Sequence, residues 1–232
     1  MSVRERALSF VGLYAAESVI AALAACGFGL LASQVAEGWL HGKNVQILRA
    51  IDALRCPPLD RLAVALSWLG GPEGITVLGV VATIGLLLRR RRIETFLLVA
   101  ALLGGTALSV TLKPYFQRPR PDLLEALVAE TGYGFPSSHA LMSFCLYATL
   151  ACIVLMGATR KAWRWIAAAA LVLLASAIAW SRLYLGVHWL TDVLGGALVA
   201  AFWIAVSLGT LRGLGLLPAQ DHPADEREPG TG

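Results

Sequence analysis

The chain has 232 residues, of which 57% are hydrophobic and only 15% charged, against about 25% charged in an ordinary soluble domain. This composition excludes a water-soluble globule as well as fibrous, disulfide-rich and disordered classes. The formal net charge is +4, but basic residues in a membrane protein are first of all topology signals, so no nucleic-acid partner is implied. The mean hydropathy of +0.69 and several apolar runs near the roughly 20 residues that cross a bilayer predict an all-α, polytopic membrane protein.

The first apolar run covers residues 7–36 and contains one charged residue, Glu17. Because residues 18–36 alone nearly span a bilayer, we interpret Glu17 as a solvated or snorkelling carboxylate at the inner interface. The mixed segment that follows predicts an exposed connection with an amphipathic stretch around residues 45–54. No chemistry is expected in that connection.

The second apolar run, residues 62–88, is interrupted by the glycine- and proline-containing sequence at 70–74. This predicts a span that is either short or broken at its outer end. Four arginines, residues 89–92, end it. The remaining predicted spans are 93–112, about 140–156, 165 to about 183, and 189–211.

These spans predict a six-helix membrane bundle that forms a single domain over residues 1–217, with a catalytic core at about 93–211. The residues after 217 are rich in Pro, Asp, Glu and Gly, which predicts a disordered cytoplasmic tail over 218–232. Eleven of the nineteen Lys and Arg residues fall on one side of a six-span topology. By the positive-inside rule that side, with both termini, is cytoplasmic.

Three unusually polar segments reach the opposite, outer face: residues 113–121, 136–139 and 181–192. Together they supply three cations, two hydroxyls, two imidazoles and one carboxylate. Cations combined with hydroxyls and imidazoles suit a phosphoryl group, because the cations bind its oxygens and an imidazole can transfer it. The sequence therefore predicts a phosphate site at the outer surface.

Each segment has a physical reason to contribute. Ser137 and Ser138 follow a proline at the start of the fourth span, where free backbone N–H groups favour an anion. His188 and Asp192 are four residues apart, so they share one helical face. Asp192 can then fix the tautomer of His188 and leave the other ring nitrogen free to attack phosphorus.

The remaining polar side chains fit the same reaction. Lys113, Arg120 and Arg182 can stabilise charge on the equatorial oxygens of the transition state. His139 is then available to donate a proton to the departing alkoxide. The role of Arg118 stays open between a structural or lipid-headgroup contact and a catalytic one.

Residues 113–121, 136–139 and 181–192 resemble the motifs of the type 2 phosphatidic acid phosphatase superfamily, which includes the vanadium haloperoxidases. Those motifs are Lys-x6-Arg-Pro, Pro-Ser-Gly-His and Ser-Arg-x5-His-x3-Asp. The resemblance implies that His188 is the nucleophile, Asp192 its orienting partner and His139 the general acid. It also implies that Lys113, Arg120, Ser137 and Arg182 bind phosphate, without a metal or cofactor. Where the family usually has Gly, this chain has Ser138, which we expect to be tolerated if only its backbone N–H is used.

The resemblance implies an integral membrane lipid phosphatase acting on a phosphate monoester or diphosphate. Its substrate would be a phospholipid or polyprenyl phosphate, with phosphatidylglycerol phosphate and undecaprenyl diphosphate ahead of phosphatidic acid and lipid A. The short chain favours a bacterial inner-membrane enzyme. Alternatives are a lipid-phosphate carrier without turnover, a lipid phosphotransferase, a vanadate-dependent haloperoxidase and an intramembrane serine protease; the sequence leaves the oligomeric state open.

Overall fold

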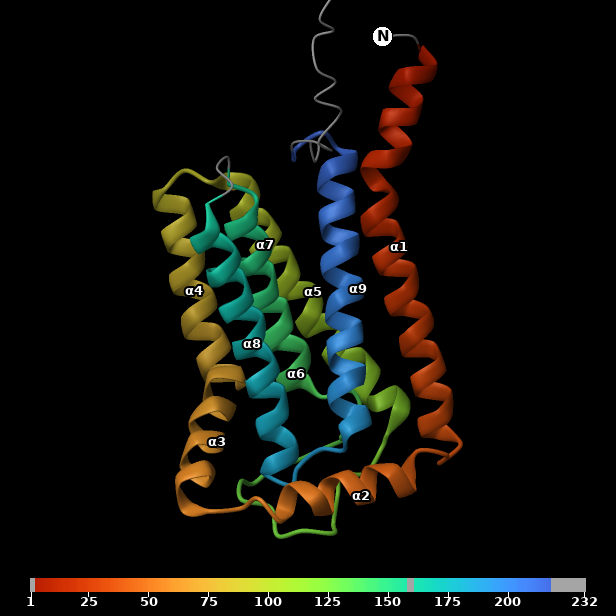
Figure 1. Ribbon diagram of the computed structural model, residues 1–232, viewed down its shortest axis with the longest axis vertical. Helices are drawn as coiled ribbons and strands as arrows, with labels where there is room; N and C mark the ends of the chain where they lie inside the picture. The colour runs from red at the N-terminus through yellow and green to blue at the C-terminus, as the bar shows by residue number, and fades with distance from the viewer. Residues whose placement is uncertain (1–2, 158–160, 218–232) are drawn as a thin grey trace, which may run out of the picture.

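The computed structural model describes the backbone of residues 3–157 and 161–217, and side chains from Ala16 onward; the predicted tail, 218–232, lies outside this part. All regular structure within the described residues is helical. Figure 1 shows the helices running mostly alongside one another, with one short helix across an end of the bundle. In chain order they are α1 (Val3–Ala36), α2 (His41–Asp52), α3 (Pro57–Gly70), α4 (Pro72–Leu88), α5 (Arg92–Phe116), α6 (Ser138–Ser143), η1 (Phe144–Ala148), α7 (Thr149–Leu155), α8 (Ala162–Tyr184) and α9 (Leu190–Gly213).

Five stretches of the described chain are long and apolar enough to cross a membrane, and the pair α3 and α4 makes a sixth if it counts as one bent span. Those five are Ala16–Ala36, Arg92–Phe116, Ser138–Leu155, Ala162–Tyr184 and Leu190–Gly213. The third of them contains the π-helical turn η1, which α6 and α7 continue on either side. The predicted all-α architecture with six spans is confirmed.

The second span is broken, at the position the sequence indicated. Helices α3 and α4 meet at an angle of 56°, and Gly71 between them has an extended backbone with ψ of 169°. Pro72, at the first position of α4, has no N–H to donate to a continuing helix. The break therefore follows directly from the glycine and proline at this point.

Small residues set the spacing between neighbouring helices. The Trp203 side chain of α9 lies against Gly104 of α5, where an added Cβ would come within 2.1 Å of the indole. The indole N–H of Trp203 donates to the carbonyl of Ala100 at 3.0 Å. Close approach over small residues is typical of membrane helices, where van der Waals packing replaces the hydrophobic driving force.

The interpretation of Glu17 as a solvated carboxylate is wrong. Helix α1 begins at Val3, and Glu17 is only 6% exposed. Its carboxylate accepts a hydrogen bond from the guanidinium of Arg212 on α9. An unpaired carboxylate would be costly inside an apolar bundle, and an opposite charge on the adjacent helix offsets that cost.

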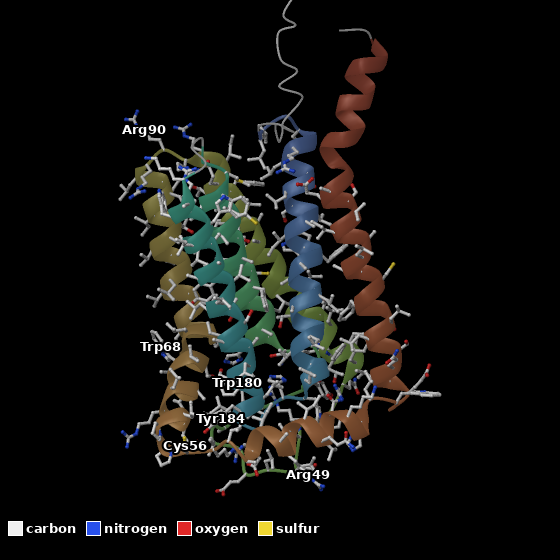
Figure 2. All side chains as sticks on the ribbon, viewed as in Figure 1. Arg49, Cys56, Trp68, Arg90, Trp180 and Tyr184 are labelled. Atoms are coloured by element: carbon white, nitrogen blue, oxygen red, sulfur yellow. The ribbon has the colours of Figure 1, made fainter. Side chains whose placement is uncertain are left out.

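The two ends of the bundle differ in character. Figure 2 shows Arg90, in the arginine-rich turn between α4 and α5, at the end opposite Cys56, Tyr184 and Arg49. Helix α2 lies across this second end (Figure 1), where the loop between α5 and α6 and the start of α9 also lie. The polar segments predicted to carry chemistry belong to that end.

Candidate active site

His188 and Asp192 form the buried centre of the site. The chain leaves α8 at Tyr184, turns through Gly186 with φ of +76° and enters α9 at Leu190. The side chain of His188 is 1% exposed, and its Nδ1 lies 3.3 Å from Oδ2 of Asp192, which is fully buried. The backbone N–H of Trp189 donates to the same carboxylate oxygen at 2.9 Å. The predicted pairing across one helical turn is present.

Arg120 identifies the tautomer of His188. Its Nη1 lies 3.1 Å from Nε2 of His188, and a guanidinium nitrogen can only donate. Nε2 is therefore the accepting nitrogen, and Nδ1 carries the proton that it donates to Asp192. The lone pair of Nε2 therefore faces the guanidinium of Arg120, and Nε2 is the ring nitrogen that can act as a nucleophile once this donor turns away.

Burial also keeps His188 uncharged. Loss of hydration lowers the pKa of His188 from 6.5 to about 4, although the hydrogen bond to Asp192 acts in the opposite direction. An imidazole with this pKa is neutral near pH 7. Only the neutral form has a lone pair to offer, so the environment favours the nucleophilic state.

Arg118 and two neutral side chains hold Asp192 in place. Nη1 of Arg118 lies 2.5 Å from Oδ1 of Asp192 and 2.6 Å from Oγ1 of Thr191. Asn44 of α2 donates to Oγ1 of Thr191 at 3.1 Å and accepts from its backbone N–H at 3.2 Å. Arg118, whose role the sequence left open, is thus a direct partner of Asp192.

A carboxylate that the sequence analysis did not single out lies among the other cations. Glu130, on the loop between α5 and α6, accepts from Nη2 of Arg120 at 3.2 Å and from Nη2 of Arg182. Nδ1 of His139 lies 3.9 Å from the same Oε1 that Arg182 binds. An anion therefore already occupies the point where three predicted site residues converge.

The broken second span supports Arg182. This arginine, in the last turn of α8, is 1% exposed, and its Nη1 donates to Oγ of Ser67 on α3. One guanidinium thus bridges α3 and the loop that carries Glu130. Sequence reasoning missed Ser67, because a single serine in an apolar run gives no signal of its own.

The start of α6 is a capped helix N-terminus. Oγ of Ser137 accepts from the backbone N–H of Ala140 at 3.4 Å, and the Ser137 N–H donates to the carbonyl of Asp192 at 2.9 Å. Gly196 of α9 allows this approach, since a Cβ there would lie 2.5 Å from the Ser137 carbonyl oxygen. The N-terminal turn of α6 is thereby held against the turn that carries Asp192.

Ser138 fits without strain in place of the family's usual glycine. It is the first residue of α6, and it is not among the described residues with positive φ. Its Oγ lies 2.6 Å from Oγ of Ser109 on α5. The expectation that a serine is tolerated here agrees with this helical backbone.

The predicted site residues thus gather in one place, some directly and some through the loop. His188, Asp192, Arg120, Arg182 and His139 are linked to one another or through Glu130. Lys113, in the last turn of α5, donates to the carbonyl of Tyr133 on the same loop at 2.9 Å. The arrangement combines a neutral imidazole, a carboxylate hydrogen-bonded to it, several cations and a second imidazole, which together suit phosphoryl transfer.

A family model described as the PAP2 superfamily matches residues 94–213, more than half of the chain. The chain belongs to the PAP2 superfamily. Phosphatidylglycerophosphatase B of Bacillus subtilis is 28% identical over 173 residues, which are 73% of this chain and 83% of that protein. Undecaprenyl-diphosphatase of Sulfolobus acidocaldarius is 32% identical over 171 residues, 71% of this chain and 76% of that protein.

Solved structures show the same PAP2 fold. The crystal structure of a transmembrane PAP2 type phosphatidylglycerolphosphate phosphatase from Bacillus subtilis aligns with a TM-score of 0.77 at 24% identity, covering 84% of this chain and 96% of that one. Aquifex aeolicus LpxE aligns with a TM-score of 0.59 at 28% identity, covering 71% of this chain and 93% of that one. The predicted family is confirmed, and the protein is a membrane phosphatase of the PAP2 type.

Proposed function

We propose that this PAP2 protein hydrolyses the terminal phosphoryl group of a membrane lipid through a phosphohistidine on His188. The observation that carries this proposal is the buried His188–Asp192 pair, whose unprotonated Nε2 accepts from the guanidinium of Arg120 at 3.1 Å. A nitrogen so placed can attack phosphorus while Arg120 and Arg182 bind the oxygens that gain charge.

In the first step, the lone pair of Nε2 forms a bond to phosphorus and the bond to the leaving oxygen breaks. His139 gives its proton to that oxygen, so an alcohol or a lipid monophosphate departs. In the second step, water attacks phosphorus, His139 takes a proton from it, and the N–P bond breaks to release inorganic phosphate. The arginines supply the positive charge throughout, so the proposal needs no metal or cofactor.

The first substrates to test are phosphatidylglycerol phosphate and undecaprenyl diphosphate. Relatives that carry the names phosphatidylglycerophosphatase B and undecaprenyl-diphosphatase support this choice. A lipid A 4'-phosphatase from Bacteroides thetaiotaomicron is 36% identical over 101 residues, which keeps lipid A in the panel beside phosphatidic acid. The proposal places the protein in a bacterial inner membrane with the site facing outward, supported by the arginine-rich turn at the opposite end (Figure 2).

The decisive experiment is phosphate release by the detergent-purified protein from these four lipids in excess chelator, beside the variant His188→Ala. We expect release by the wild type only, and inhibition by vanadate, which mimics five-coordinate phosphorus. Strict dependence on an added metal ion would contradict the mechanism. Lipid binding without any release would favour the carrier function instead.

A further inference from the structure

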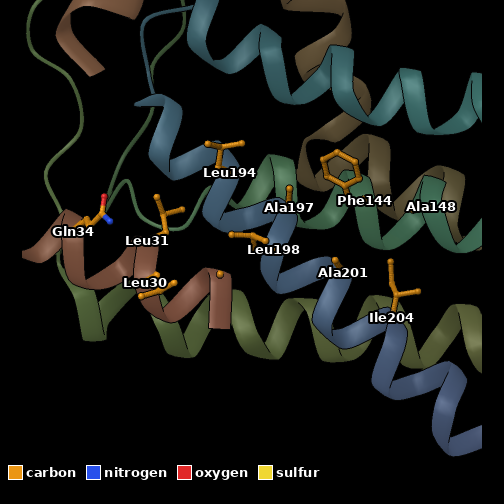
Figure 3. A pocket seen from close by; sticks show the side chains of 11 residues that line it. Leu30, Leu31, Gln34, Phe144, Ala148, Leu194, Ala197, Leu198, Ala201 and Ile204 are labelled. Atoms are coloured by element: carbon orange, nitrogen blue, oxygen red, sulfur yellow. The ribbon is translucent and has the colours of Figure 1, made fainter. Parts of the chain in front are cut away.

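An apolar groove runs between α1 and α9 on the side of the bundle, with a volume of about 620 Å³. One wall is a face of α1 that includes Gly27 and Gln34, and the other is a face of α9 from Leu194 to Ile204; Phe144 of η1 also lines it. Figure 3 shows side chains of α1 and α9 facing each other across this space. Two small residues, Ala197 and Ala201, line α9 there.

A second, smaller cavity of about 310 Å³ lies beside Arg120, the residue that contacts His188. Its lining includes Arg118, Arg120 and Trp189, so it carries the guanidinium that contacts Nε2 of His188. Gln34 lines both this cavity and the apolar groove. A molecule with a phosphorylated head and a hydrocarbon chain could therefore occupy both spaces at once.

The length and direction of the groove match one leaflet of a membrane. Leu194 lies only two residues beyond Asp192, and the groove continues along α9 to Ile204. Ten residues of helix extend about 15 Å, which is half of the roughly 30 Å hydrocarbon core of a bilayer. The groove thus begins at the level of the catalytic carboxylate and runs toward the membrane midplane.

We infer that the groove between α1 and α9 holds the hydrocarbon chain of the lipid substrate while its phosphoryl group lies among Arg120, Arg182 and His188. This inference rests on the proposed function and deepens it, because it assigns a chain-binding subsite. Arg118 and Arg120 line the cavity at one end, together with Asp122, and can bind the phosphorylated head of such a lipid. The apolar walls of the groove complement its tail. The chain then lies between α1, which is outside the residues matched by the family model, 94–213, and α9, which is within them.

The test fills the groove and compares a lipid substrate with a soluble one. Ala197→Phe and Ala201→Phe each place a ring in the groove, and Ala170→Phe places one on an exposed position of α8 as the matched control. For each variant we would measure kcat/KM with dioleoyl phosphatidic acid in micelles and with para-nitrophenyl phosphate, which has no chain. We expect kcat/KM of the groove variants to fall about ten-fold or more on the lipid and to stay unchanged on the soluble ester. A ten-fold change corresponds to about 1.4 kcal/mol, and burial of a hydrocarbon chain contributes more than this.

The outcomes separate this inference from the proposed function. Equal losses on both substrates, or no loss on either, would overturn the chain-binding subsite. A groove variant that turns a dimer into a monomer without changing substrate preference would also overturn it and assign the groove to a second copy. A wild-type protein inactive on both substrates and on the lipid panel would instead overturn the proposed function.

Discussion

The two halves of the site are prepared differently in the absence of substrate. On the nucleophile side, Asp192 is fully buried and binds His188, Arg118 and the Trp189 backbone, so the geometry needed for attack already exists. On the cation side, Arg120 and Arg182 both bind the carboxylate of Glu130. The first half is arranged for chemistry, whereas the second is neutralised by an anion that belongs to the protein.

This difference shows where substrate binding changes the site. A phosphoryl group needs the same guanidinium donors that Glu130 uses, so the two anions compete for them. Asp192 needs no such exchange, because its partners are not substrate ligands. His188 gives up only its contact with Arg120, whose guanidinium then binds the phosphate oxygens. Changes on the nucleophile side should therefore act on the chemical step, and changes at Glu130 should act on binding.

Removing the nucleophile should produce the largest effect. We expect His188→Ala to lower kcat by about a thousand-fold or more, because several kcal/mol of transition-state stabilisation disappear with the attacking group. Incubation with phosphorus-labelled lipid followed by acid-free quenching measures the phosphoenzyme directly. A labelled protein in this variant would reassign the nucleophile and remove the distinction between the two halves of the site.

Removing Arg118 tests whether the nucleophile side depends on its supporting contacts. We expect Arg118→Gln to lower kcat by about 10- to 100-fold with a smaller change in KM, since Asp192 loses a buried charged partner and His188 its fixed orientation. Arg49→Gln, an exposed arginine on α2, is the control. A change in KM alone would show that Arg118 contacts the lipid headgroup instead.

The acid limb of the pH profile also tests whether Arg118 acts on His188 through Asp192. Burial lowers the pKa of His188 to about 4, and kcat/KM should fall about ten-fold per pH unit below it, because the protonated imidazole cannot attack. In Arg118→Gln the charge of Asp192 is no longer shared with a guanidinium, so it stabilises the imidazolium more strongly. The limb should then move to higher pH relative to the wild type on the same substrate, and an unmoved limb would contradict the coupling.

Sequence predicted most of the fold, because its signals are strong and local. Apolar runs of bilayer length fix the spans, and Gly71 with Pro72 fixes the break in the second one. The pairing of Glu17 with Arg212 could not be predicted, since 195 residues separate them and only the packing of α1 against α9 brings them together. In the sequence alone, a charged residue near the end of an apolar run looks the same whether its side chain is solvated or paired with an opposite charge.

The candidate site likewise contains some residues that the sequence predicts and others that it does not. The spacing of His188 and Asp192 is read directly from one helical turn, and the cations follow from the matched motif. Glu130 and Asn44 have no such signal. Glu130 is one of several acidic residues on a connecting loop, and Asn44 lies on another helix; what assigns them is the folding of that loop over Arg182 and of α2 against Thr191.

Neutralising Glu130 should have the smallest effect and the most informative direction. Glu130→Gln keeps the shape of the side chain but removes the charge that competes with phosphate, so we expect KM for the lipid and the inhibition constant for vanadate to fall by about two- to five-fold, the scale of a partly exposed ion pair. Glu125→Gln, at an exposed position of the same loop, controls for the loss of one negative charge near the site.

If Glu130→Gln instead lowers kcat and raises KM, the carboxylate holds Arg120 and Arg182 in position for substrate. The cation side would then be as prearranged as the nucleophile side, with Glu130 as part of its framework.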